Sequence, residues 1–101
     1  ESQTGNALLP TLLEGYTQQM MEKMLELQQC MENKNSLTTQ QVAHAIKSMS
    51  ANIGAERVRS ISAQIEKSGR DNKSCDFSKD LLELKEAYSE FVKEFEEQFI
   101  S

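Results

Sequence analysis

The chain has 101 residues, with 11 Lys and Arg against 16 Asp and Glu, so its formal net charge is −5. Hydrophobic residues make up 38% of it, with one Pro, four Gly and no Trp. A chain this short forms one domain and cannot hold a (β/α)₈ barrel or a full dinucleotide-binding fold. The acidic balance argues against nucleic acid as a partner, because phosphate contacts need clustered Lys and Arg.

The cysteines and the hydropathy pattern exclude further classes. Cys30 and Cys75 form no C-x-x-C pair and His44 is the single histidine, so we expect ordinary thiols and no metal site. No apolar run approaches the roughly 20 residues that span a membrane, and no signal peptide is recognisable. We therefore expect a cytoplasmic domain without direct membrane contact. Because the first residue is Glu1 and not Met, we also expect a piece of a longer protein.

The first third of the chain shows helical spacing. Its apolar residues stand three or four positions apart and share one helix face: Leu9, Leu13, Tyr16, Met20, Met24, Leu27 and Met31. The predicted helix covers about residues 8–32, and its regular part begins near Pro10, since proline is tolerated in a first turn. The methionines on this face are expected to fill the core.

The second predicted helix covers about residues 39–53 and has the clearest start signal. Thr38 fits the N-cap of a capping box with Gln41 three residues later, and Leu37 and Val42 fit a hydrophobic staple. Gly54 then permits either a left-handed C-terminal cap or a close backbone approach.

The third and fourth predicted helices cover about residues 55–68 and 77–99. Gly69 is expected to close the third, whose apolar face is Val58, Ile61 and Ile65. The fourth has a longer stripe: Phe77, Leu81, Leu84, Tyr88, Phe91, Phe95 and Phe99. No segment alternates with period two, so no sheet is expected. Four amphipathic helices with short connections predict an all-α fold, an antiparallel four-helix bundle, monomeric as an isolated domain.

His44 is the one candidate for a reactive centre. On a helical wheel centred on Val42, Ile46, Met49 and Ile53 fall within about 40° and form the core stripe. His44 falls at about 200°, so its ring is expected to face solvent. It shares that face with Gln40, Lys47, Ser48 and Ala51. A bundle di-metal site would need Glu-x-x-His motifs, which are missing, and no acid that could orient the imidazole is recognisable from the sequence.

The stretch from His44 to Gly54 reads HAIKSMSANIG. It resembles the signature of the histidine-containing phosphotransfer (HPt) domain family, roughly H-x-L-K-[GS]-x-[SA]-x-x-[LI]-G. The matching residues are His44, Ile46, Lys47, Ser48, Ser50, Ile53 and Gly54. The stretch IEKSGR at 65–70 is similar to the family's L-E-x-x-G-R, and LLPTLLEGY at 8–16 is similar to its first helix. The likeness covers nearly the whole chain.

The resemblance implies a multistep His–Asp phosphorelay. His44 would be the nucleophile that takes a phosphoryl group from a receiver-domain aspartate and passes it to another receiver. Lys47 would offset the phosphoryl charge, and Gln40, Ser48, Ala51 and Arg70 are candidate contacts for the phosphate or the partner. Ala43 and parts of the first helix are further candidates for docking. The domain itself would bind no cofactor, and Mg²⁺ would reside on the receiver.

Glu66 stands where some relatives have Gln, so direct support of the phosphate from that position is not expected. The resemblance further implies a domain without kinase activity of its own, from a hybrid sensor histidine kinase whose parent protein can be anchored in the inner membrane. A free-standing shuttle would use the same mechanism. The alternative from a different class is a non-catalytic helical module for protein interaction, which explains the bundle and the acidity equally well.

Overall fold

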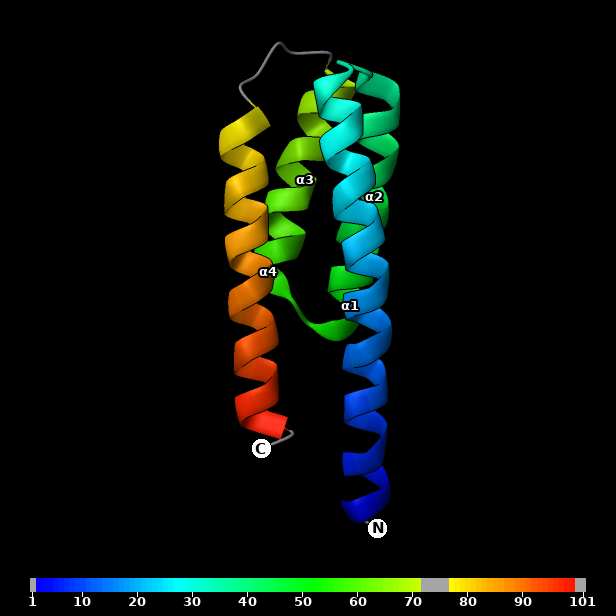
Figure 1. Cartoon of the computed structure of the whole chain (residues 1–101), viewed down its shortest axis with the longest axis vertical. Coiled ribbons are helices and arrows are strands. Elements are labelled where there is room, and N and C mark those ends of the chain that lie inside the picture. Colours follow the sequence, from blue (N-terminus) through cyan, green and yellow to red (C-terminus); the bar gives the residue numbers. More distant parts are fainter. Residues whose placement is uncertain (1, 72–76, 100–101) are drawn as a thin grey trace.

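The computed structural model describes the backbone of residues 2–71 and 77–99, and the side chains of residues 10–71 and 78–99. This described part is helical and contains no strand. Its four helices are α1 (Ser2–Glu32), α2 (Ser36–Ile53), α3 (Glu56–Arg70) and α4 (Phe77–Phe99). They run alternately up and down, as Figure 1 shows. The predicted all-α, antiparallel four-helix bundle is therefore confirmed.

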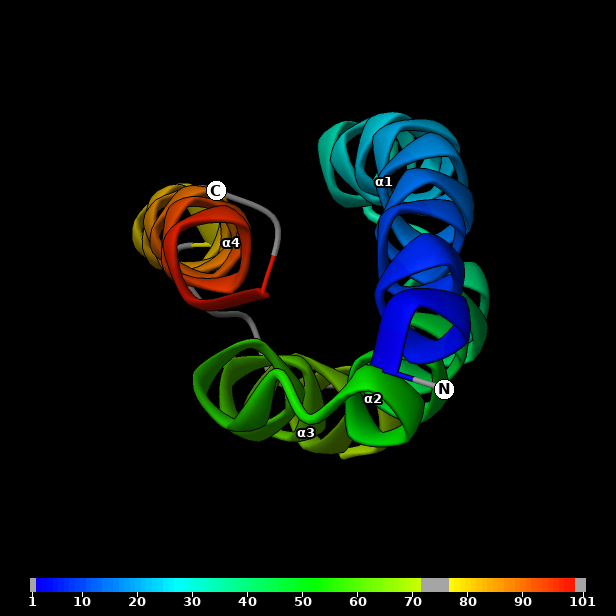
Figure 2. The same cartoon turned by 90° about the horizontal axis from the view of Figure 1, so that it is seen from below.

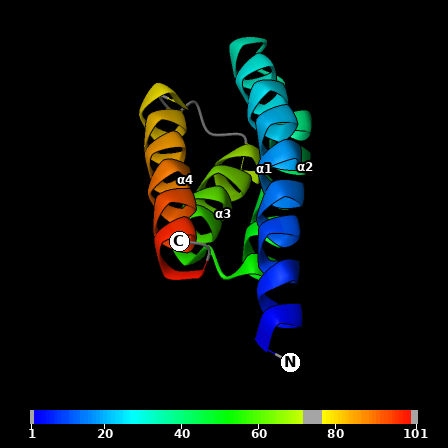
Figure 3. The same cartoon turned by 60° about the horizontal axis from the view of Figure 1, so that its bottom comes forward.

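The helices follow one another around the bundle in chain order. Seen from below, α2 lies beside both α1 and α3, and α4 stands next to α3 (Figure 2). The N-terminal turns of α1 extend past the lower end of the other helices, which is also clear when that end is tilted forward (Figures 1 and 3). None of the described helices is both long and apolar enough to cross a membrane.

The core consists of the apolar stripes that the spacing predicts. Each helix contributes fully buried side chains, among them Met20, Leu27, Ile46, Val58, Ile65 and Leu84. Met24, Met49, Leu81, Tyr88 and Phe91 pack against them while remaining partly accessible. The side chains of Leu9 and Phe77, which belong to the predicted stripes, lie outside the described residues, and Phe99 is exposed at the end of α4. Because burial of such side chains is the main driving force for folding, these stripes determine how the helices face one another.

Tyr16 connects three helices through its ring and its hydroxyl group. Its ring packs on Tyr88 and Phe91 of α4, with centroids 6.0 and 5.6 Å away. Its hydroxyl oxygen lies 2.8 Å from the Ser50 hydroxyl on α2, so that two buried polar groups satisfy each other. Burial raises the pKa of Tyr16 to about 12, so the phenol stays neutral at physiological pH.

The structure describes one of the two cysteines. Cys30 is a free, buried thiol on α1, and burial raises its pKa. A buried thiol with a raised pKa is a small apolar core residue and a poor nucleophile. Cys75 lies outside the described residues.

The first helix begins earlier than the predicted residue 8, because α1 starts at Ser2, and the expectation that its regular part begins near Pro10 is wrong, since Pro10 lies inside it. Proline lacks an N–H and its ring crowds the carbonyl one turn earlier, so one helix hydrogen bond is lost at this position. Pro10 is exposed, so its ring displaces no core contact. One missing bond therefore does not end the helix.

The start of α2 also differs from the prediction. Asn35 is the N-cap, since its side-chain oxygen accepts a hydrogen bond from the backbone N–H of Thr38 at 3.1 Å. Thr38 therefore lies in the first turn and is not the cap, and Leu37 is 64% exposed and makes no staple. The reason is the tight corner after α1, where Asn35 N–H bonds the carbonyl of Cys30 and Lys34 N–H that of Met31. This Schellman arrangement brings Asn35 directly into capping position.

Lys34 adopts an unfavourable backbone conformation at this corner. Its φ is 55°, and it is the only described residue other than glycine with a positive φ. An L residue in the left-handed region costs about 1 kcal/mol relative to glycine. We expect Lys34→Gly to raise the free energy of unfolding by about 1 kcal/mol in urea denaturation. Asn33→Gly is the control and should give no gain, and a loss of stability in Lys34→Gly would contradict this account of the corner.

The end of α2 is as predicted. Gly54 has φ 83° and caps the helix in the left-handed conformation. Gly54 N–H bonds the carbonyl of Ala51, and Ala55 N–H bonds that of Ser50. This second Schellman corner turns the chain directly into α3.

Candidate functional site

His44 lies on the outer face of α2, where the wheel predicts it. Its side chain is 60% exposed, whereas Ile46, two residues on, is completely buried. The contrast follows from the helical period, since residues two apart point to nearly opposite sides. The imidazole can therefore be approached by a large partner, and replacing it leaves the core untouched.

The ring is held by an acidic residue that the sequence analysis does not identify. Nδ1 of His44 lies 2.8 Å from Oε2 of Glu66 on α3. The other carboxylate oxygen, Oε1, lies 2.6 Å from Nζ of Lys47. Glu66 thus bridges the two residues of α2, and its side chain is only 13% exposed. In the sequence, the one indication of this role is that Glu66 stands one turn before Gly69 in IEKSGR. The packing of α3 on α2 brings its carboxylate to the imidazole ring.

This contact assigns the hydrogen-bonding roles of both partners. Lys47 and, to a smaller extent, His44 hold the pKa of the Glu66 carboxyl below its usual range, against the opposing effect of burial. The carboxylate is therefore ionised at neutral pH and can only accept hydrogen bonds. It follows that Nδ1 of His44 donates this hydrogen bond and carries a proton, and that in the neutral imidazole the free lone pair is on Nε2.

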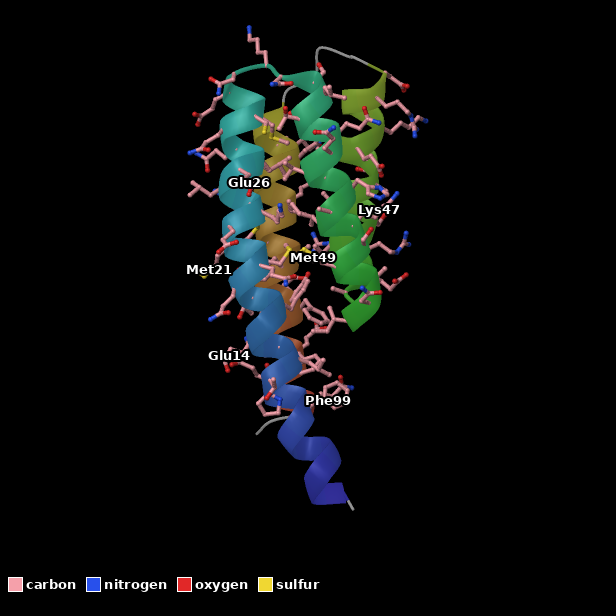
Figure 4. The ribbon with its side chains drawn as sticks, turned by 90° about the vertical axis from the view of Figure 1, so that its right-hand side faces the viewer. Glu14, Met21, Glu26, Lys47, Met49 and Phe99 are labelled. Carbon is pink, nitrogen blue, oxygen red and sulfur yellow. The ribbon has the colours of Figure 1, made fainter. Side chains whose placement is uncertain are left out.

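Lys47 lies at the boundary between α2 and α3. Figure 4 shows it on the side of α2 away from α1, with Met49 directed to the other side of the helix. It stands three residues after His44, as the sequence predicts, and its ammonium group is engaged with Glu66 in this structure. A phosphoryl group on Nε2 would therefore compete with Glu66 for this cation.

Gly69 sets the distance between the two helices that form the site. A Cβ built on it would lie 3.0 Å from the carbonyl oxygen of Ser36 and 3.1 Å from the backbone nitrogen of Gln40. The prediction that Gly69 closes the third helix is wrong, since α3 continues to Arg70 and Gly69 is buried within it. Glycine is needed here for close approach to α2, which allows Glu66, one turn earlier, to reach His44.

We expect Gly69→Ala to destabilise the protein by about 1–3 kcal/mol, because the added methyl group would push against backbone atoms that cannot rotate away. Urea denaturation measures the change. Gly15→Ala is the matched control, because nothing lies within 4 Å of a Cβ at that position of α1. It should stabilise by up to about 1 kcal/mol through helix propensity. Equal behaviour of the two variants would show that the close approach at Gly69 is unimportant.

The other predicted site residues surround His44 at different distances. Ser48 and Ala51 are exposed on the same face of α2, and Gln40 is half-buried one turn before His44, beside Gly69. Arg70 is exposed at the end of α3, and no hydrogen bond or ion pair joins it to His44 in the described part of the chain. The prediction that Ala43 helps to dock a partner is wrong, because its side chain is completely buried.

An apolar groove of about 430 Å³ lies along α1 and the C-terminal half of α2, with one wall from α4. Apolar residues form much of its lining: Leu12, Tyr16, Met49, Ile53 and Phe95.

The described residues contain no group of three or more His, Cys, Asp or Glu side chains placed to hold a metal ion.

The fold and the site define a helical domain with one solvent-facing histidine, oriented by a carboxylate, on the surface of a four-helix bundle. The model of the Hpt domain family matches residues 11–94. This match covers most of the chain and includes His44, Lys47 and Glu66, so the chain belongs to the Hpt domain family. Its members serve histidine phosphotransfer in phosphorelays and work with response-regulator receiver domains. No curated protein and no solved structure matches the chain significantly.

Proposed function

We propose that His44 accepts a phosphoryl group from the aspartate of one receiver domain and delivers it to the aspartate of another. The observation that carries the proposal is the state of the ring: Nδ1 is bound by Glu66 at 2.8 Å, while the side chain is 60% exposed. Nε2 is therefore the nucleophilic nitrogen in this proposal, and it belongs to a side chain that a receiver can reach.

The chemistry is an exchange of one P–O bond for one P–N bond. The lone pair of Nε2 attacks phosphorus, the bond to the aspartyl oxygen breaks, and its electrons return to the receiver carboxylate. Passing the group onward reverses these events with a second carboxylate. Mg²⁺ would be held by the receiver, where it neutralises charge on the transferring group.

The residues around His44 have roles in this proposal that follow from their positions. Lys47, one turn away, offsets the added negative charge when it turns from Glu66 to the phosphoryl group. Ser48 and Ala51 have small side chains that let the receiver come close, and the Ser48 hydroxyl can donate to a phosphoryl oxygen. Gln40 and Arg70 lie at the edge of the surface on which the receiver would dock.

The context of the domain belongs to the same proposal. We place it in the cytoplasm, as a monomeric unit of a hybrid sensor histidine kinase or as a free-standing shuttle. Both arrangements use the same transfer chemistry. The docked receiver would contact the His44 face of α2 through a small, transient interface.

Transfer from a phosphorylated receiver tests the proposal. The purified domain is mixed with phosphorylated receiver and Mg²⁺, and the label is followed by intact mass and by its stability to acid and alkali. We expect one phosphoryl group on His44, labile in acid and stable in alkali. If a folded domain takes no phosphate from a panel of active receivers, the non-catalytic interaction module becomes the better explanation.

A further inference from the structure

Glu66 uses its two oxygens for two different partners. Oε2 accepts from Nδ1 of His44 at 2.8 Å, and Oε1 contacts Nζ of Lys47 at 2.6 Å. The arrangement spans two helices, and the close approach at Gly69 maintains it. Nδ1 therefore faces a fixed anion, while Nε2 is left to react.

We propose that Glu66 is a positioning residue that keeps the proton on Nδ1 of His44 after phosphoryl transfer as well as before it, so that phosphorylated His44 remains a fast donor at neutral and mildly alkaline pH. This inference rests on the proposed function. It makes Glu66 the residue that controls how long the phosphorylated state of His44 lasts.

The bond changes show why the proton matters. When Nε2 gives its lone pair to phosphorus, Nδ1 retains its proton and the ring becomes positively charged. When the group leaves, the electrons of the P–N bond return to Nε2 and the product is neutral imidazole, still protonated on Nδ1. A phosphorylated ring that had lost this proton would have to leave as the imidazolate anion, which is a far poorer leaving group. Transfer in either direction then requires no proton to enter or depart.

The charges at the site favour this role. The Glu66 carboxylate faces the positive ring directly, and the opposing cation, Lys47 on α2, is engaged by the other oxygen of the same carboxylate. Arg70 follows one turn later on α3, and α1 and α4 add no hydrogen bond or ion pair to the cluster in the described residues. Before transfer, Lys47 keeps the carboxylate ionised, since it is the main cause that lowers the pKa of Glu66. After transfer, when Lys47 turns to the phosphoryl group, the positively charged ring beside Oε2 favours the ionised carboxylate in its place. The anion is thus available over the pH range in which the ring would otherwise lose its proton.

The test compares wild type with Glu66→Gln. Gln has the same shape and can still accept from Nδ1, but it lacks the charge that retains the proton. His44 is loaded with phosphoramidate, the reagent is removed, and loss of phosphate is followed by intact mass from about pH 6 to about pH 10. In wild type, we expect rapid loss to persist to higher pH. In Glu66→Gln, the decline should begin about one pH unit lower, with a roughly tenfold longer lifetime near neutrality, as expected for one charge-assisted hydrogen bond.

Two further variants keep the test decisive. Glu56→Gln removes the same charge from an exposed position of α3 that pairs with Arg59, and it should behave as wild type. Glu66→Asp withdraws the carboxylate by one methylene and should shift the profile in the same direction as Gln. Circular dichroism checks that each variant is folded.

The outcomes separate this inference from the proposed function. If phosphorylated wild type and both Glu66 variants share one pH profile, Glu66 does not hold the proton and the inference is wrong, while His44 remains the acceptor. If wild type takes no phosphate from phosphoramidate or from a receiver, the proposed function fails and this inference fails with it.

Discussion

We expect His44→Gln to abolish phosphoryl acceptance completely while leaving the free energy of unfolding within about 0.5 kcal/mol of wild type. The loss follows because no other histidine exists in the chain. Stability is preserved because the side chain is 60% exposed and contributes nothing to the core. Transfer from a phosphorylated receiver measures the first quantity, and urea denaturation measures the second.

Lys93→Gln is a suitable control, since it alters an exposed side chain on α4 and should leave both quantities unchanged. Two results would contradict the account. Residual acid-labile phosphate on His44→Gln would place the acceptor elsewhere, and a large loss of stability would mean that the ring supports the fold. If His44→Gln still binds a receiver but exchanges no phosphate, His44 is needed for phosphoryl transfer and not for docking.

The second large effect concerns the core. Leu84 on α4 is completely buried, and Leu82, two residues earlier on the same helix, is 58% exposed. We expect Leu84→Ala to lower the free energy of unfolding by about 2–5 kcal/mol. The variant buries less apolar surface on folding, and the removed side chain leaves a cavity in the core. Domains are typically stable by only about 5–15 kcal/mol, so this is a large share of the total.

Leu82→Ala makes the same chemical change on the solvent side of the same helix. We expect its effect on stability to stay within about 0.5 kcal/mol, measured by the midpoint of urea denaturation. Similar losses in the two variants would mean that α4 packs with a different face toward the core. That would overturn the arrangement in which Tyr88 and Phe91 pack against Tyr16.

The residues that face the core could be predicted because helical spacing is a local property. Positions three and four apart share a face whatever the helix packs against, so Met20, Ile46, Val58, Ile65 and Leu84 were identifiable from spacing alone. The same reasoning placed His44 outside the core, and Gly54 was recognisable as a cap because few other residues adopt positive φ.

The helix starts were predicted less well, because several residues compete to cap one helix. Asn35 and Thr38 are both good caps by residue type. The Schellman corner at Lys34 decided between them, and it depends on how the chain leaves α1. The expectation that the regular helix begins near Pro10 is wrong because the loss of one backbone hydrogen bond at a proline does not end α1.

The helical class, the buried faces and the exposure of His44 follow from the amino-acid sequence alone, since each of these depends on periodicity within one helix. The group that holds the imidazole is decided by the way in which the helices pack. Glu66 and His44 are 22 residues apart and on different helices, so their contact depends on how α2 and α3 pack. Gly69 permits that packing, because a Cβ at this position would lie only 3.0 Å from the carbonyl oxygen of Ser36, and the sequence pattern does not show this contact. The orientation of the reactive nitrogen is therefore a property of the helix pair.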